Sequence, residues 1–385
     1  MTYYNGVRTT RTTRCCSALA LFVAASVSLG ALSLFPIQKR WTLSLNAQLS
    51  AAPAFDTANA YFALAGDQVV AYTLANGTQL WATTARPRFD LAVGDGLLFL
   101  VEPDQLTALR AATGAVVWRL PFSQTLAAAP VWDNGWLVLV TTQPAVLAFR
   151  ATDGDLIWRH ALRATAHIKP ALAADRVYIP TDDGHVVALR VDTGAPVWDR
   201  RLGGAPAEIL ALNDRLYVGS KDNFYCLEAI DGAVGWHFRT GAEVIGLPTI
   251  DERNVYLVSL DNVLRALSRA SGVQQWIRPL PLRPLRGPIK AGDTLLVPGI
   301  AGLRGYNIKD GTAAGEIPVD GELAAPPRLV SALNAPLPQF LVVTRDIAKG
   351  ATATLIARDI DPPIQPTVAP LLNPTKPAPT LPQQP

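Results

Sequence analysis

The octapeptide VDTGAPVW at residues 191–198 is one copy of a pattern that recurs along most of the chain. In each copy a glycine follows Asn, Asp, Thr or Ser, and in six of seven copies a tryptophan stands four residues after the glycine. The glycines are Gly77, Gly114, Gly154, Gly194, Gly232, Gly272 and Gly311. They stand 37 to 40 residues apart, which is the repeat length of a four-stranded propeller blade rather than the ~33–34 residues of helical repeats.

Each repeat contains four short segments of β-strand character. Around VDTGAPVW these segments are PALAA, DRVYIPT, GHVVALRV and APVWDRRL, separated by turn residues. Glycine accepts the positive φ that such turns need. The tryptophan falls on the outermost strand, where we expect it to pack into the joint between neighbouring blades. These tryptophans are Trp81, Trp118, Trp158, Trp198, Trp236 and Trp276.

The repeated Gly-to-Trp spacing resembles the PQQ-like β-propeller repeat, found in quinoprotein alcohol dehydrogenases and in the propeller lipoprotein of the outer-membrane β-barrel assembly machinery. The resemblance covers about residues 41–360, estimated from the repeat period. It implies an all-β propeller, and it says little about function because one propeller scaffold carries many unrelated sites.

The two ends of the repeat array predict an eighth blade. RWTLSLNAQL at 40–49 contains Trp41 like an outer strand without a blade, whereas 325–333, 338–345 and 352–360 read as three strands without a tryptophan. We expect the Trp41 strand to pair with the last blade and close the ring, which removes the open sheet edges. The seventh copy has Gly315 in place of tryptophan, so the joint between the last two blades is expected to be the weaker one.

The first 38 residues read as a targeting segment or membrane anchor. Arg8, Arg11 and Arg14 precede an uncharged run over residues 17–35, which is long enough to span a bilayer. This predicts an anchored protein with the propeller, residues 39–360, on the extracytoplasmic side. The alternative is secretion after cleavage before Ala31, although the run exceeds a usual signal peptide. The adjacent Cys15 and Cys16 stand before the run, whereas a lipobox cysteine directly follows the run, so a lipobox is lacking.

Residues 361–385 are proline-rich and predict an extended, disordered tail. The net charge of +3 is too small to favour nucleic acid as a partner.

No catalytic, cofactor-binding or metal-binding constellation is apparent. A quinoprotein enzyme, as the resemblance would imply, needs PQQ, calcium, a general-base Asp and often a disulfide between adjacent cysteines. The adjacent Cys15 and Cys16 precede the apolar run, and Cys226 lies in a strand pattern that favours a buried apolar role. The four histidines have no metal-ligand spacing. We therefore predict no cofactor and no enzymatic activity.

Cations recur where each outer strand leads into the next blade, and all such connections should emerge on one face. They could form a positive rim that binds an acidic protein surface; alternatively, they are ordinary solvated loop charges. The candidate partner-binding residues are Arg163, Lys169, Arg200, Arg201, Arg239, Arg283 and Arg286.

The sequence thus predicts an extracytoplasmic, protein-binding propeller, with a role in envelope or outer-membrane protein assembly implied by the resemblance. Two alternatives remain open: a PQQ-dependent quinoprotein-type dehydrogenase with a degenerate site, and a ligand-sensing ectodomain.

Overall fold

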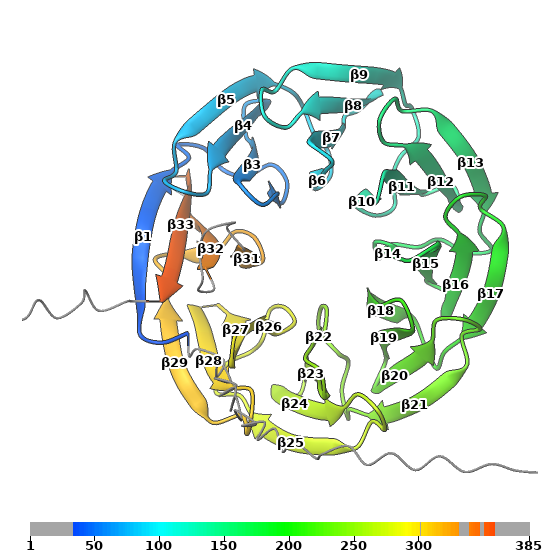
Figure 1. The fold of residues 1–385 in the computed structure, drawn as a ribbon, viewed down its shortest axis with the longest axis vertical. Coiled ribbons are helices and arrows are strands. Elements are labelled where there is room, and N and C mark those ends of the chain that lie inside the picture. Colours follow the sequence, from blue (N-terminus) through cyan, green and yellow to red (C-terminus); the bar gives the residue numbers. More distant parts are fainter. Residues whose placement is uncertain (1–33, 301, 331–338, 347–349, 359–385) are drawn as a thin grey trace, which may run out of the picture.

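The chain forms a ring of eight antiparallel β-sheets around a central axis (Figure 1). The structure, a computed structural model, describes residues 34–300, 302–330, 339–346 and 350–358. The ring confirms the predicted eight-bladed propeller. Among the described residues no helix is long and apolar enough to cross a membrane. Most of the predicted anchor and the whole proline-rich tail lie outside these ranges.

Blades 1 to 4 follow one another along the chain, and each has four strands ordered from the channel outward. Blade 1 comprises β2 (Ala54–Phe55), β3 (Asn59–Leu64), β4 (Gln68–Thr73) and β5 (Gln79–Thr84). Blade 2 comprises β6 (Ala92–Gly94), β7 (Leu97–Val101), β8 (Gln105–Arg110) and β9 (Val116–Pro121). Blade 3 comprises β10 (Val131–Asp133), β11 (Trp136–Thr141), β12 (Ala145–Arg150) and β13 (Leu156–Ala161). Blade 4 comprises β14 (Ala171–Ala173), β15 (Arg176–Thr181), β16 (His185–Arg190) and β17 (Pro196–Arg201).

Blades 5 to 7 continue in the same order, and blade 8 combines both ends of the propeller. Blade 5 comprises β18 (Pro206–Ala211), β19 (Arg215–Ser220), β20 (Asn223–Glu228) and β21 (Val234–Arg239). Blade 6 comprises β22 (Thr249–Ile250), β23 (Asn254–Ser259), β24 (Val263–Ser268) and β25 (Gln274–Pro279). Blade 7 comprises β26 (Ile289–Ala291), β27 (Thr294–Gly299), β28 (Gly302–Asn307) and β29 (Ala313–Pro318). Blade 8 comprises β1 (Ile37–Ser44), β30 (Glu322–Leu323), β31 (Arg328–Val330), β32 (Gln339–Asp346) and β33 (Gly350–Arg358).

Ring closure occurs as the sequence predicts. β1 is the outer strand of blade 8 and pairs antiparallel with β33, from Ile37 opposite Arg358 to Ser44 opposite Thr352. The first and last strands of the propeller therefore lie side by side (Figure 1). This pairing removes the open outer edge that blade 8 would otherwise expose.

The hydrophobic core is divided among the joints between blades. The buried clusters combine side chains of two neighbouring blades, such as Tyr61 and Trp81 of blade 1 with Leu98 and Leu100 of blade 2. Because each blade buries both of its faces against neighbours, its central strands β3, β7 and β11 are almost entirely buried. The fold is therefore stabilised by repeated contacts between adjacent blades.

In seven of the eight blades, a tryptophan of the outer strand joins its blade to the next one. Trp158 of β13 donates a hydrogen bond from Nε1 to the carbonyl of Val191 at 2.7 Å, and its ring lies against Gly194 of blade 4. Gly194 has a φ of 68°, and a Cβ at this position would come within 2.6 Å of the indole. Glycine is therefore required at position 194 for two reasons: the positive φ of the turn and the close approach of the indole ring.

The same pairing explains the repeat, because the glycine of one copy receives the tryptophan of the preceding blade. The other pairs are Trp41 with Gly77, Trp81 with Gly114, Trp118 with Gly154, Trp198 with Gly232, Trp236 with Gly272 and Trp276 with Gly311. In each pair the indole also donates to a carbonyl of the next blade.

The joint between blades 7 and 8 uses a different aromatic residue. A Cβ on Gly315 or Gly305 would lie 2.6 or 2.5 Å from the ring of Phe35, so Phe35 covers both glycines of blade 7. The neighbouring Leu34 is fully buried among Ile317, Phe340 and other residues of blades 7 and 8. Core packing thus begins inside the apolar run assigned to the anchor, because apolarity alone does not distinguish membrane burial from core burial.

Candidate binding face and central channel

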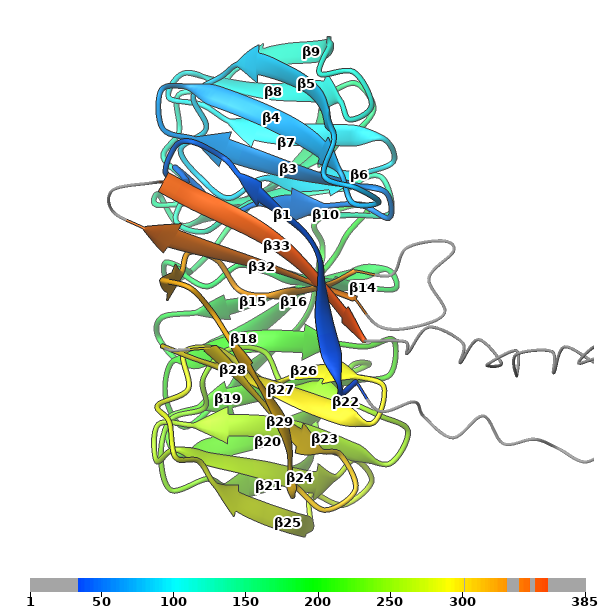
Figure 2. The same ribbon diagram turned by 90° about the vertical axis from the view of Figure 1, so that its left-hand side faces the viewer.

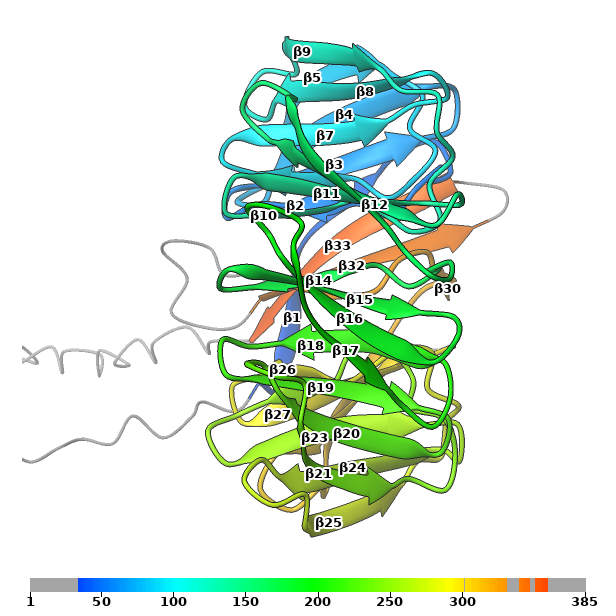
Figure 3. The ribbon, with the colours of Figure 1, turned by 90° about the vertical axis from the view of Figure 1, so that its right-hand side faces the viewer.

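The connections between blades lie on one face of the ring, as predicted; we call it the connection face (Figure 2 and Figure 3). The opposite face, the turn face, carries the turns that follow the innermost strands. β1 begins on the turn face, because Ile37 pairs with Arg358 and the strand then runs toward the connection at residues 45–53.

Three of the predicted partner-binding cations already have partners in the structure. Arg163 lies 3.9 Å from Asp199, and Arg239 lies 3.0 Å from Asp222 in a neighbouring turn. Arg200 lies on the outer wall, where its Nε donates to the carbonyl of Gly232 in the next blade. Arg200 therefore contributes to a blade joint. The exposed ion pairs of Arg163 and Arg239 contribute little to stability.

The remaining predicted cations have no hydrogen-bond or ion-pair partner among the described residues. Arg201 is exposed at the end of β17, and Arg283 is exposed in the connection between blades 6 and 7. Arg286 follows in the same connection and lines the channel, as does Lys169 from the connection between blades 3 and 4. The structure thus brings Lys169 and Arg286 to the channel and leaves Arg201 toward the perimeter.

Exposed apolar side chains accompany Arg283 and Arg286 on the connection face. Leu285 is 39% exposed, Leu260 45% and Ile300 61%. The connection at residues 280–288 passes between the turns that hold the other two, because Leu280 N–H donates to the carbonyl of Asn262 and Leu285 N–H donates to that of Pro298. These side chains define the blade 6/7 patch: Leu260, Arg283, Leu285, Arg286 and Ile300.

Prolines shape the wall of the central channel. A buried proline stands at or just before the innermost strand in seven of the eight blades: Pro53, Pro130, Pro170, Pro206, Pro248, Pro288 and Pro327. Blade 2 has the buried Leu91 at the corresponding place. Proline lacks an N–H donor, which interrupts pairing with the neighbouring strand. The innermost strand has two or three residues in blades 1 to 4, 6 and 7, and six residues in blade 5, where Pro206 is its first residue.

The channel consists of two chambers that share a waist. The chamber on the connection side has a volume of about 1010 Å³, and the chamber toward the turn face has a volume of about 600 Å³. The residues that line both chambers define the waist: Ala52, Pro53, Asp90, Ala129, Lys169, Arg328 and Leu329.

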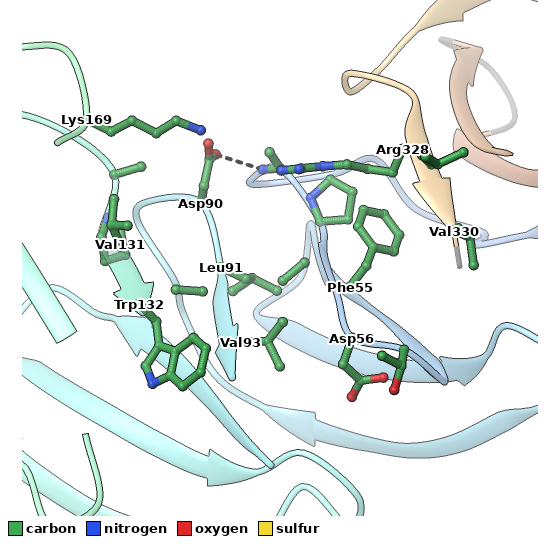
Figure 4. A pocket seen from close by; sticks show the side chains of 18 of the residues that line it. Phe55, Asp56, Asp90, Leu91, Val93, Val131, Trp132, Lys169, Arg328 and Val330 are labelled. Atoms are coloured by element: carbon green, nitrogen blue, oxygen red, sulfur yellow. Dashed lines mark hydrogen bonds between the residues drawn. The ribbon is translucent and has the colours of Figure 1, made fainter. Parts of the chain in front are cut away.

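Charged groups converge at this waist. Figure 4 shows Lys169 and Arg328 extending toward Asp90 from different sides, above a wall that contains Phe55, Leu91 and Trp132. Asp90 accepts a hydrogen bond from the backbone amide of Ala52 at 3.0 Å. Neither cation forms an ion pair or hydrogen bond with another described residue.

Among the described residues, no group of three or more His, Cys, Asp or Glu side chains could hold a metal ion. Cys226 is fully buried in β20, and burial raises the pKa of its thiol. His167 and His185 lie 2.6 and 2.5 Å from Asp182 and Asp199, in two separate pairs. Cys15 and Cys16 lie outside the described residues.

The described channel does not supply the ligand set that PQQ with calcium would need. Its unpaired carboxylates, Asp90 and Glu208, come from the connection into blade 2 and from β18 of blade 5. Calcium takes six to eight oxygen ligands from groups that surround one point. Two carboxylates from well-separated blades do not provide them.

Comparison with known proteins agrees with the fold. A family model described as "Outer membrane protein assembly factor BamB" matches residues 38–119, 65–212 and 210–325. The chain belongs to this family. Among curated proteins, none matches the sequence.

Solved structures with the same architecture include members with different functions. BamB from Moraxella catarrhalis is 20% identical, with a TM-score of 0.67 over 83% of this chain and 99% of that one. The quinohemoprotein alcohol dehydrogenase from Comamonas testosteroni is 13% identical, with a TM-score of 0.64 over 87% of this chain and 79% of that one. A europium-containing methanol dehydrogenase is 12% identical, with a TM-score of 0.65 over 86% and 95%. At these identities the likeness shows the fold alone.

Sequence reasoning missed Asp90, Arg328 and the exposed apolar residues of the blade 6/7 patch. Arg328 stands in a segment that was assigned only as a strand, and the proximity of Lys169 and Arg328 requires the ring to be closed. The prolines before the innermost strands were a readable signal for where the chain turns into the channel.

Proposed function

We propose that this protein is an extracytoplasmic protein-binding scaffold in envelope or outer-membrane protein assembly, and that it docks its partner on the blade 6/7 patch. The carrying observation is the juxtaposition of three exposed apolar side chains with Arg283 and Arg286, whose guanidinium groups have no partner among the described residues. Membership of the BamB family supports the assembly role.

The composition of the patch fits a protein partner. Interface cores combine exposed apolar side chains with arginine, which binds carboxylates in a bidentate manner. Leu260, Leu285 and Ile300 project from separate segments, so a partner would bury apolar area on three neighbouring supports. A partner surface with apolar side chains surrounded by carboxylates would complement it.

The position of the N-terminus supports an orientation for an anchored protein. Leu34 and Phe35 are packed at the blade 7/8 joint, and β1 begins on the turn face. If the part of the apolar run before Leu34 holds the protein at a membrane, the turn face is nearest to that membrane. The connection face, with the blade 6/7 patch, then points away from it and is free to meet a partner.

The test is capture of partners from envelope extract by the purified propeller, with the captured proteins identified by mass spectrometry. The double variant Arg283→Glu/Arg286→Glu and the single variant Leu285→Asp should lose the component of the outer-membrane assembly apparatus that the parent captures. Exposed loop residues rarely contribute more than fractions of a kcal/mol to folding, so melting temperatures should hardly change.

A matched control places the same charge reversal elsewhere on the connection face. Arg163→Glu/Arg201→Glu changes the net charge equally, but it lies outside the blade 6/7 patch and should leave capture intact. Arg200 is excluded from the test set because its bond to Gly232 joins two blades. Equal capture by parent and both patch variants would overturn the proposed site.

A further inference from the structure

The central channel combines an apolar chamber with unpaired cations at its waist. The chamber toward the turn face, about 600 Å³, lies within the usual size range of small-molecule pockets. Its wall is made mainly of apolar side chains from blades 1, 2, 3 and 8: Phe55, Leu91, Val93, Val131, Trp132 and Val330. Such a surface would bury the body of a small apolar ligand.

The polar groups that line the chamber lie at its two ends. Lys169 and Arg328 reach the waist from blades 4 and 8, and Asp90 lies between them (Figure 4). At the other end of the chamber, Asp56 already accepts hydrogen bonds from Tyr61 and from the backbone of Ala58 and Asn59. Asp56 is therefore committed to its own turn, whereas the waist retains hydrogen-bond donors without acceptors.

Charge at the waist favours an anion. Two cations face one carboxylate there, and the chamber on the connection side adds Arg286 and Lys290 against Glu208. With Asp56 of the chamber toward the turn face included, four cations line the channel against three carboxylates. An anionic head group at the waist would gain charge-assisted hydrogen bonds from Lys169 and Arg328.

We propose that the channel binds a small amphiphilic anion, with its carboxylate, sulfonate or phosphate group at the Lys169–Arg328 waist and its apolar body in the chamber toward the turn face. The waist and the chamber toward the turn face contain no residue of the blade 6/7 patch, although Arg286 of that patch lines the chamber on the connection side. The proposal does not depend on the proposed scaffold function. The waist would bind the charged group of the ligand, and the chamber toward the turn face would bind its apolar body.

The test uses two fluorescent probes that share their rings and differ in charge. 8-Anilinonaphthalene-1-sulfonate is an amphiphilic anion, and N-phenyl-1-naphthylamine is its neutral counterpart. The folded protein should bind the sulfonate saturably at one site. Lys169→Gln and Arg328→Gln should each weaken binding by about tenfold, as expected for a lost charge-assisted bond, while binding of the neutral probe stays unchanged.

Three further variants test the charge at the waist, the volume of the chamber and the specificity of the effect. Asp90→Asn keeps an acceptor for the Ala52 amide but removes the negative charge, so it should tighten sulfonate binding. Val131→Phe fills the chamber and should weaken binding of both probes. Arg163→Gln/Arg201→Gln, away from the channel, should change neither. Near-UV circular dichroism identifies variants that bind dye only because their packing has loosened.

Some results would overturn the channel site. These are the absence of saturable sulfonate binding, equal affinity in the parent and the waist variants, or weaker binding in Asp90→Asn. They would leave the blade 6/7 patch untouched, because partner capture is measured separately.

Discussion

The joint between blades 3 and 4 and the joint between blades 7 and 8 fill equivalent space with side chains of different origin. Trp158 enters the first joint from the outer strand of its own blade and lies on Gly194. Phe35 enters the second joint from the segment before β1 and lies on Gly315 and Gly305. Closure of the ring therefore depends on the N-terminal segment in two ways. β1 pairs with β33, and Leu34 and Phe35 pack between blades 7 and 8.

This comparison constrains processing of the N-terminus. Cleavage before Ala31, the alternative to an anchor, leaves Leu34 and Phe35 on the mature protein. Cleavage beyond Phe35 would remove the aromatic side chain that covers Gly315. A secreted form with a closed ring is compatible with the first of these two positions.

The largest expected effect comes from removing the closing strand. Deletion of residues 1–47 takes away Leu34, Phe35 and all of β1, which exposes the edge of β33 and the face of the blade 8/1 core. We expect this protein to aggregate or fail to fold, because an unpaired edge and a large apolar surface become accessible. Size-exclusion chromatography and thermal melting provide the measurement.

Two shorter deletions divide the effect. Deletion of residues 1–33 should leave the stability of the propeller equal to that of the full-length protein. Deletion of residues 1–36 keeps β1 from Ile37 onward and loses only the packing of Leu34 and Phe35. The second should melt at a lower temperature than the first. Identical melting of the 1–33 and 1–47 deletions would contradict the closure described here.

The next largest effect is expected at a tryptophan joint. Trp158→Ala removes a buried indole, which is 8% exposed, and its hydrogen bond to Val191. Loss of a buried aromatic side chain costs about 3–5 kcal/mol, and urea unfolding would measure it. Arg159→Ala, on the exposed face of the same strand, is the matched control and should change stability by less than about 0.5 kcal/mol.

The contrast between these joints also shows what the sequence could predict. The tryptophans were predictable because the same spacing recurs in six copies, and Trp41 could be added as their counterpart at the N-terminus. Phe35 was not predictable, since it belongs to no repeat and stands in an apolar run that reads equally well as membrane-spanning. The partner of Gly315 becomes evident only when the ring is closed.

The candidate site was less predictable than the fold for a similar reason. The sequence indicated that connections carry cations on one face, but it could not show that Arg239 is paired with Asp222 while Arg283 is unpaired. Pairing depends on which turn lies beside each connection. The approach of Lys169 and Arg328 depends on residues about 160 positions apart in the sequence, which only the ring brings together.

A smaller effect is expected at the blade 7/8 joint. Phe35 is only partly buried, so Phe35→Ala should cost about 2 kcal/mol, below the value for a fully buried aromatic residue. Gly315→Ala alone should also destabilise, because its Cβ would lie 2.6 Å from the Phe35 ring. In the Phe35→Ala background that clash is absent. The double-mutant cycle should therefore be non-additive, and simple additivity of the two unfolding energies would show that Phe35 and Gly315 do not touch.

The smallest effect concerns acidity at a joint where a tyrosine supports the tryptophan. Tyr256 lies under Trp276, with ring centroids 5.8 Å apart, and its hydroxyl donates to Asp251 at 2.6 Å. In blade 3 the apolar Val138 packs beside Trp158 instead. Burial acts to raise the pKa of Asp251, but the hydrogen bonds from Tyr256 and from the backbone N–H groups of Asn254 and Arg253 outweigh it, and the pKa is lowered.

A lowered carboxyl pKa in the folded state fixes the direction of the pH dependence. The ionised Asp251 adds stability above its unfolded-state pKa of about 3.9, and this contribution is lost as the pH falls through the lower folded-state value. Tyr256→Phe removes the tyrosine hydrogen bond, so it should cost about 1 kcal/mol at pH 7. The variant and the parent should approach each other in unfolding free energy as the pH falls below the unfolded-state pKa of about 3.9 and through the lower folded-state value, because Asp251 then becomes protonated in the parent. Trp158→Ala should show no such convergence, because its loss is apolar; a Tyr256→Phe deficit that stays constant from pH 7 to pH 2.5 would mean that the tyrosine acts through packing and not through the carboxylate.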